Sequence, residues 1–290
     1  MFDPLLDRLI DLAFEEDLAG GGDVTTRATV LPRTAGLATV RAKEELTLAG
    51  IGVFRRVFER LDSTVELEIL HDDGTRLPKG TEVLRARGNA HSLLIGERPA
   101  LNFLMRLSGI ATLTAKMVQA VQGTGARVVD TRKTTPGWRA LEKAAVRAGG
   151  GANHRIGLYD GVLIKDNHIE AAGGIRPAVE RARHTAHHLL KIEVEASTLQ
   201  QVDECLVVGV DGILLDNMDD QTTADAVKRV RAFEASHGSS TGSRIVLEAS
   251  GNMTLERLPR VAATGVDLIS MGALTHQAHS VDLSMKLKLV

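Results

Sequence analysis

The stretch GVDGILLDN, residues 209–217, decides the fold class of this 290-residue chain. A glycine, a valine and an aspartate lead into a short apolar run, and polar Asp216 and Asn217 follow it at once. A run of this length bounded by turn residues is typical of a strand that is buried on both faces. A second copy of the same approach, Gly265-Val266-Asp267, leads into the apolar residues 268–269. The repetition indicates that one strand-and-helix unit recurs along the chain.

Similar units lie on both sides of this stretch. Short apolar runs occur at residues 127–129, 162–164, 192–194, 213–215, 245–247 and 268–269. Helical patterns lie between them, at residues 138–148, 176–188, 198–207, 222–235 and 254–263. Apolar strands that alternate with helices indicate a parallel sheet covered by helices. We therefore expect an α/β fold, an irregular and incomplete β/α barrel.

Polar residues follow each apolar run directly. In a β/α barrel the carboxyl ends of the strands converge on one face, where active sites are found. Charged residues after a strand can also simply mark its exit to solvent, but the pattern recurs after six runs, so we expect a shared pocket. The segments concerned are Asp130-Thr131-Arg132-Lys133, Lys165-Asp166-Asn167-His168, Glu195, Asp216-Asn217, Glu248-Ala249-Ser250-Gly251 and Ser270-Met271-Gly272.

The first third of the chain has a different pattern. Residues 3–17 have the apolar spacing of an amphipathic helix. Residues 29–89 contain strand-like runs at 37–42, 65–69 and 81–86, and residues 95–120 are helical in pattern. We predict an N-terminal α+β domain over residues 1–108, to which residues 277–290 return, and a barrel domain over residues 109–276.

Composition limits the function classes. A formal net charge of −2 argues against a nucleic-acid binder, yet residues 127–165 hold eight Lys/Arg against three Asp/Glu, a local charge of +5. Such a segment is either a solvated basic face or an anion pocket. The apolar runs are far shorter than the ~20 residues of a membrane span. Cys205 is the single cysteine and is expected to be a small buried apolar residue. The first sixteen residues show no export signal, so we expect a cytoplasmic protein.

Seven segments together resemble the signatures of the quinolinate phosphoribosyltransferase family. The resemblance extends in order from residues 16–18 to the end of the chain and is far more specific than a single short motif. The segments are ERPALNF (97–103), DTRKTTPG (130–137), GGGANHR (149–155), LIKDNH (163–168), LLDNM (214–218), LEASGN (247–252) and GALTH (272–276). The resemblance implies an open-faced sandwich for the α+β domain and a decarboxylating transferase that makes nicotinate mononucleotide from quinolinate and phosphoribosyl pyrophosphate for NAD biosynthesis.

The resemblance also implies roles for individual cations. Arg132, His154, Arg155 and Lys165 would contact the two quinolinate carboxylates, and Lys133 and Lys165 would lie near the phosphoribosyl donor. Guanidinium groups suit this task because their planar fork binds a carboxylate or phosphate bidentately. Family members borrow an arginine from a neighbouring subunit, which here would be Arg98, so a homodimer is implied. Without the resemblance, Arg98 would be taken for an ordinary surface residue.

Two carboxylates and two loops complete the predicted site. Glu195 and Asp216 end successive strands, and Mg²⁺ held partly by substrate oxygens is the natural bridge between them and an anionic substrate. They can also hydrogen-bond the ribose hydroxyls and offset positive charge at C1′. We expect the 5′-phosphate to bind at Ser250-Gly251-Asn252 and Gly272-Ala273, where backbone N–H groups near helix starts make an anion site. The alternative for these loops is a pair of plain turns.

Two other functions stay open at this point. One is a paralogue of the same fold, of the type encoded in molybdate-transport operons, that uses another acceptor. The other is a noncatalytic anion-binding protein. The sequence departs from the family at Trp138, where a smaller apolar residue is common, and at Gln277-Ala278-His279.

Overall fold

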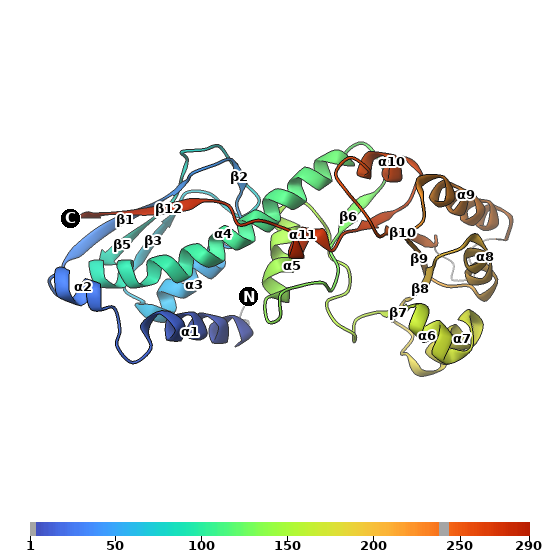
Figure 1. Ribbon diagram of the computed structural model, residues 1–290, viewed down its shortest axis with the longest axis horizontal. Helices are drawn as coiled ribbons and strands as arrows, with labels where there is room; N and C mark the ends of the chain where they lie inside the picture. Colours follow the sequence, from blue (N-terminus) through green and yellow to red (C-terminus); the bar gives the residue numbers. More distant parts are fainter. Residues whose placement is uncertain (1–3, 238–243) are drawn as a thin grey trace. The chain divides into compact units, whose positions relative to one another are not determined.

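A computed structural model describes residues 4–237 and 244–290 of the chain (Figure 1). Asp3, the first residue of the predicted N-terminal helix, lies outside these residues. The chain divides into two compact units. Unit 1 comprises Met1–Ala115, Thr135–Gly150 and Leu274–Val290, and unit 2 comprises Lys116–Thr134 and Gly151–Ala273. Each unit contains its own main sheet and its own hydrophobic core.

Unit 2 is built on a six-stranded parallel sheet in the order β6-β11-β10-β9-β8-β7. The last strand, β11, pairs with the first, β6, as in a barrel. Among the described residues no strand pairing joins β6 to β7, and β6 instead makes an isolated bridge from Val129 to Ala152, so the barrel is incomplete. The strands are β6 (Arg127–Val129), β7 (Val162–Ile164), β8 (Ile192–Ala196), β9 (Gly212–Asp216), β10 (Val246–Ser250) and β11 (Leu268–Ser270).

Helices connect successive strands of unit 2, and their buried faces carry the expected apolar residues. In α8, for example, Val202, Cys205 and Leu206 are buried, and the helix begins with a capping box between Thr198 and Gln201. Cys205 has no exposed surface, which confirms the prediction for it. The helices are α6 (Asp166–Ala172), α7 (Ile175–Thr185), α8 (Leu199–Val208), α9 (Asp220–His237) and α10 (Leu258–Ala263).

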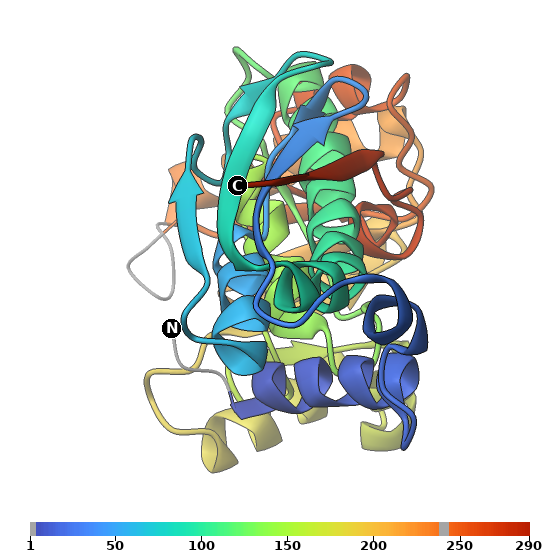
Figure 2. The same ribbon diagram turned by 90° about the vertical axis from the view of Figure 1, so that its left-hand side faces the viewer.

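Unit 1 contains a four-stranded antiparallel sheet in the order β12-β1-β5-β3. Its strands are β1 (Ala35–Ala42), β3 (Glu66–Ile69), β5 (Glu82–Asn89) and β12 (Leu283–Leu289), and β2 (Leu46–Thr47) pairs with β4 (Arg76–Leu77) in a separate ribbon. Alternate residues of β1 are buried, so one face of the sheet is covered. Figure 2 shows the C-terminal strand β12 beside β1.

Helices supply the rest of the core of unit 1. They are α1 (Pro4–Leu18), α2 (Val24–Thr29), α3 (Ile51–Leu61), α5 (Arg139–Ala148), the four-residue α11 (Ala273–His276) and α4 (Ala90–Ala120), in which the boundary between the units falls. Gly96 of α4 lies against Phe58 of α3, because a Cβ atom at Gly96 would be 2.6 Å from the ring. Arg56 of α3 holds Asp7 of α1 with two hydrogen bonds of 2.8 Å.

The predicted fold class, an α+β domain followed by an irregular, incomplete β/α barrel, is confirmed. The sequence pattern missed α3, because residues 29–89 were predicted as strands and turns alone. Among the described residues, no helix is both long and apolar enough to cross a membrane.

Candidate active site

One face of the unit 2 sheet carries an unusual set of polar side chains. Strand register places Glu195 and Glu248 opposite Leu214, on either side of β9, and Ser250 opposite Asp216. Because side chains alternate along a strand, residues two apart point to the same face. Glu193, Glu195, Asp216, Glu248, Ser250 and Ser270 therefore share one face. The strands bring together the predicted Glu195, Asp216 and Ser250.

Lys165 joins this face from the end of β7. Leu163 pairs with Glu193, so Lys165, two residues further on, points to the same side as Glu195. Its Nζ atom lies 2.8 Å from Oε2 of Glu195. The Glu195 side chain is 9% exposed and that of Lys165 is 48% exposed. The predicted metal ligand and the predicted substrate-binding lysine are thus direct neighbours.

The segment Asn153–His154–Arg155 is held against the sheet by Asp130. The Asp130 side chain is completely buried, and its carboxylate accepts hydrogen bonds from the Asn153 side chain and from the His154 backbone N–H, the latter at 2.9 Å. A buried carboxylate with two N–H donors is well satisfied and fixes the segment that donates them. Asp130 therefore positions His154 and Arg155.

His154 reaches two carboxylates, Glu248, which the sequence analysis placed in the shared pocket without a role, and Glu193, which it missed. Its Nε2 atom lies 3.2 Å from Oε2 of Glu193 and 3.4 Å from Oε2 of Glu248. Burial, together with the charge of Glu193, raises the pKa of Glu248 to about 7. The sequence pattern had predicted that Glu248 follows its strand. The structure places it inside β10 instead. The alternation Glu193-Val194-Glu195 was the available signal that Glu193 shares the face of Glu195.

Two arginines at the site interact electrostatically. Burial lowers the pKa of Arg155, and the charge of Arg132 lowers it further. The Arg155 guanidinium donates a hydrogen bond of 2.9 Å to the carbonyl of Gly161, and Arg155 also lines a cavity of about 390 Å³ beside β7. Arg132 and Lys133 are exposed. Two positive charges that repel each other in this way favour the binding of an anion.

The two predicted phosphate loops have different structures. Gly272 directly precedes α11, whereas residues 253–257 separate Asn252 from α10, which begins at Leu258. Gly251 has a φ of 92°, and a Cβ atom there would lie 2.1 Å from Oδ1 of Asn217. Glycine thus permits the loops after β9 and β10 to approach each other.

Comparison with known proteins agrees with this arrangement. Two family models match, the quinolinate phosphoribosyl transferase N-terminal domain over residues 23–108 and its C-terminal domain over residues 110–286. The chain belongs to the quinolinate phosphoribosyltransferase family. As a member of that family it is an enzyme of the pentosyl-transferring class.

Similar proteins cover nearly the whole chain. A Bacillus subtilis (strain 168) protein named "Probable nicotinate-nucleotide pyrophosphorylase (carboxylating)" is 44% identical over 98% of this chain and 94% of its own length. The solved structure of the nicotinate-nucleotide pyrophosphorylase from Francisella tularensis has a TM-score of 0.91 at 35% identity and covers 99% of this chain and 98% of that one. The Streptococcus pyogenes NadC structure has a TM-score of 0.91 at 39% identity, covering 100% and 99% of the two chains.

Arg98 differs from the other predicted residues of this family member. It is an exposed residue of α4 in unit 1, whereas the other predicted site residues belong to unit 2. Trp138, at which the sequence departs from the family, stacks on Phe103 with ring centroids 4.7 Å apart. In the segment that follows α11, the carbonyl of Ala278 accepts a hydrogen bond from Arg106. Both departures are therefore accommodated by contacts within unit 1.

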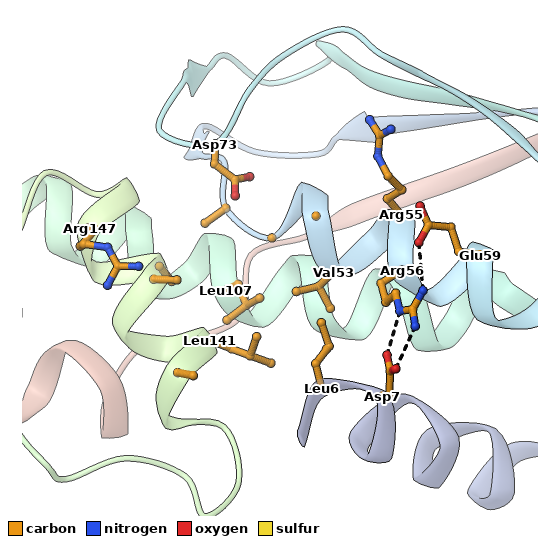
Figure 3. Close-up of a pocket in the computed structure, with 16 residues that line it drawn as sticks. Leu6, Asp7, Val53, Arg55, Arg56, Glu59, Asp73, Leu107, Leu141 and Arg147 are labelled. Carbon is orange, nitrogen blue, oxygen red and sulfur yellow. Dashed lines mark hydrogen bonds and ion pairs between the residues drawn. The ribbon is translucent and has the colours of Figure 1, made fainter. Parts of the chain in front are cut away.

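A further cavity lies wholly in unit 1 of this transferase (Figure 3). Its volume is about 550 Å³, with walls from α1, α3 and α5 and an apolar lining that includes Leu6, Val53 and Leu141. The ion pair between Arg56 and Asp7 lies at one side of it. Sequence reasoning missed this cavity because it missed α3.

Proposed function

We propose that the chain transfers the phosphoribosyl group of phosphoribosyl pyrophosphate to quinolinate and releases pyrophosphate, CO₂ and nicotinate mononucleotide, a step of de novo NAD biosynthesis. The observation that supports this most directly is the close approach of Lys165 to Glu195 on a sheet face that Arg155 and His154 also adjoin. A diacid and a polyanion need several fixed cations in a small volume.

Cations of unit 2 would hold the pyridine diacid. Arg132, His154, Arg155 and Lys165 are assigned to the two ring carboxylates, and Lys133 and Lys165 to the donor's phosphates. The charge of Arg132 lowers the pKa of Arg155, and a carboxylate bound between the two side chains would relieve this repulsion. We assign the 5′-phosphate to the loops Ser250-Gly251-Asn252 and Gly272-Ala273, whose backbone N–H groups suit an anion.

Glu195 and Asp216 fit a magnesium site. They are diagonal neighbours on one face of adjacent strands, and their carboxylate oxygens are the ligands that Mg²⁺ prefers. When bound, Mg²⁺ neutralises charge on the leaving pyrophosphate. The Lys165 ammonium group neutralises the Glu195 carboxylate. This carboxylate therefore does not repel the anionic donor.

The reaction proceeds by substitution at C1′. The pyridine nitrogen attacks as pyrophosphate departs, and the sugar passes through an oxocarbenium-like transition state. Glu195 and Asp216 offset the positive charge that develops at C1′, and Lys133 and Lys165 hold the donor's phosphates. The carboxylate at ring position 2 then leaves as CO₂, the positive ring nitrogen stabilises the electron pair left on C2, and C2 takes up a proton from solvent. The contribution of these residues is preorganised electrostatics, so no general base is assigned.

We also propose that the enzyme is a cytoplasmic homodimer in which Arg98 completes the partner's site. The exposure of Arg98 on α4 is compatible with this role. Mixing two inactive variants, Arg98→Ala and Lys165→Met, tests it. Mixed dimers regain one complete site and hence activity if Arg98 is lent across the interface, whereas no recovery after subunit exchange contradicts the proposal. The net charge of −2 does not favour nucleic acid as a partner.

Incubation with quinolinate, phosphoribosyl pyrophosphate and Mg²⁺ tests the function itself. We expect equimolar nicotinate mononucleotide and CO₂, and loss of both when EDTA replaces Mg²⁺. Turnover with another acceptor but none with quinolinate would identify the paralogue, and binding without product would identify a noncatalytic anion-binding protein.

A further inference from the structure

His154, Glu193 and Glu248 form a compact cluster beneath the proposed carboxylate site. Nε2 of His154 and one oxygen of each carboxylate lie within 4.8 Å of one another. Imidazole and carboxylate are also the usual ligands of Zn²⁺, so the composition alone is compatible with a metal site. The hydrogen bond at the second ring nitrogen of His154, Nδ1, distinguishes a metal site from a hydrogen-bonded cluster.

Nδ1 of His154 accepts a hydrogen bond of 2.7 Å from the backbone N–H of Arg155. A ring nitrogen that accepts a hydrogen bond has no proton, so the proton of the neutral imidazole lies on Nε2. A histidine that binds a metal through Nε2 instead donates a hydrogen bond from Nδ1. The atom of His154 that faces the two carboxylates is therefore an N–H donor and not a metal ligand.

The pKa of His154 and the geometry of its ring point to different charge states. Burial lowers the pKa of His154, but the hydrogen bond to Glu193 and the charge of Glu248 outweigh burial and raise it. A second proton would have to bind Nδ1, towards which the Arg155 N–H already points at 2.7 Å. Because this backbone N–H is fixed, it excludes a proton on Nδ1. The ring is therefore neutral in this conformation.

Glu248 is the second observation that points to a function for the cluster. It is 1% exposed, and neither of its carboxylate oxygens has a hydrogen-bond partner among the described residues. A buried polar group without a partner is rare in a native protein. The titratable groups that face it are Glu193, His154 and Lys165. Glu248 thus places a second buried carboxylate oxygen 3.4 Å from Nε2 of His154, in addition to its acceptor Glu193.

The orientation of His154 is transmitted to Arg155. The imidazole holds the Arg155 backbone N–H, and Asp130 holds the His154 backbone N–H. With the Arg155 backbone held in this way, the hydrogen bond to the Gly161 carbonyl fixes the position of the guanidinium. If the ring turned, both the Arg155 N–H and Glu193 would lose a partner.

We propose that Glu193 and Glu248 are positioning residues that hold His154 as its Nε2–H tautomer, so that His154 fixes the Arg155 backbone and aims its guanidinium at a quinolinate carboxylate. This inference rests on the proposed function for the identity of the substrate. Both ring nitrogens are engaged, so this inference replaces the direct carboxylate contact proposed above for His154 with an action through Arg155.

Nitrogen-15 NMR of the intact enzyme tests the tautomer without any substitution. Long-range ¹⁵N–¹H spectra distinguish the Nδ1–H form, the Nε2–H form and the imidazolium, and the signal is assigned with a His154→Gln variant. We expect the Nε2–H pattern at pH 7.5, unchanged when Zn²⁺ is added. An Nδ1–H or imidazolium pattern, or a shift of the His154 signal on addition of Zn²⁺, overturns the proposal. Because no substrate is present, this result is independent of the proposed function.

Three variants test the effect on substrate binding. Glu193→Leu and Glu248→Leu remove the carboxylates, and Glu193→Gln restores an acceptor for the Nε2–H of His154. We expect the KM for quinolinate to rise about tenfold to a hundredfold in Glu193→Leu, as for the loss of a buried partner. The KM for phosphoribosyl pyrophosphate and kcat should change by less than about threefold, and Glu193→Gln should recover most of the loss.

Glu180→Gln, on the exposed surface of α7, is the matched control and should behave as the wild type. If Glu193→Leu and Glu193→Gln are equally impaired, or if both KM values rise together, the positioning role is wrong. Absence of turnover by the wild-type enzyme with quinolinate would instead refute the proposed function.

Discussion

Nζ of Lys165 lies 2.8 Å from Oε2 of Glu195, although the two residues are 30 positions apart in the sequence. The contact joins the end of β7 to β8 and pairs a proposed substrate ligand with a proposed magnesium ligand. Because the lysine is half exposed and the carboxylate is buried, the pair can open towards an incoming anion while Glu195 stays in place. The substitution of Lys165 is therefore expected to affect catalysis more than folding.

Lys165→Met should lower kcat/KM for quinolinate by a factor on the order of 10² to 10³, the usual effect of removing one preorganised electrostatic group. The free energy of unfolding should change by less than about 1 kcal/mol, because half-exposed ion pairs stabilise a protein only weakly. Lys165→Arg should recover only part of the activity, since a planar guanidinium does not replace a point charge. Steady-state kinetics and urea unfolding measure both effects, with Lys191→Met, on the surface, as control. A wild-type kcat/KM in Lys165→Met would refute the assignment.

Arg155→Lys should raise the KM for quinolinate about tenfold or more, even though the charge is kept. The guanidinium holds the Gly161 carbonyl and still presents further N–H groups to a carboxylate, whereas an ammonium group lacks this planar fork. The same change at Arg127, an exposed residue at the start of β6, should leave the KM unchanged. Initial rates at varied quinolinate concentration provide the measurement, and equal KM values for the two variants would contradict the prediction.

Much of the barrel could be predicted because each strand is a short apolar run with clear boundaries. The runs at residues 127–129 and 162–164 coincide with β6 and β7. The helix α3 was missed for a physical reason. Its buried residues Ile51, Phe54 and Phe58 have helical spacing, but Gly50 and Gly52 flank its start, and strand-like segments lie on both sides. The strand prediction was therefore extended across residues that form a helix. Packing stabilises this helix.

Only the site residues at the ends of strands could be predicted from the sequence. Lys165, Glu195 and Asp216 follow or end apolar runs, so their convergence follows from the topology. Glu193 and Glu248 approach His154 from strands that are not adjacent, on either side of β9. A Cβ atom at Gly212 of β9 would make only ordinary van der Waals contact with Cγ of Glu193, at 3.4 Å. The meeting therefore depends on strand register, which no local pattern reveals.

Gly109→Ala should destabilise unit 1 by about 1–3 kcal/mol, the usual range for overpacking. Gly109 lies within α4, and a Cβ atom there would be 2.0 Å from the carbonyl oxygen of His279, a backbone atom that cannot move aside easily. Gly52→Ala is the matched control in α3, where nothing lies within 4 Å of the added atom. It should stabilise by about 0.5 kcal/mol through chain entropy. Urea midpoints at one protein concentration compare the two variants, and equal midpoints would contradict the steric argument.

Glu248→Gln should make stability less dependent on pH. Burial and the charge of Glu193 raise the pKa of Glu248 to about 7 from an ordinary value of 4.5, so the folded state binds this proton more tightly than the unfolded state. The stabilisation is complete below about pH 4.5 and is lost as the pH rises to about 7. At 1.36 kcal/mol per pKa unit the loss is at most about 3 kcal/mol, and the variant, which has no carboxyl group at this position, does not undergo it. The unfolding free energy of the variant minus that of the wild type should therefore increase between pH 5 and 7.5 and then level off. Urea unfolding at intervals of half a pH unit measures this difference, with Glu180→Gln as control. A constant difference across the range would show that Glu248 is already ionised at pH 5, and that the like charges of Glu193 and Glu248 are compensated by a cation and not by a proton.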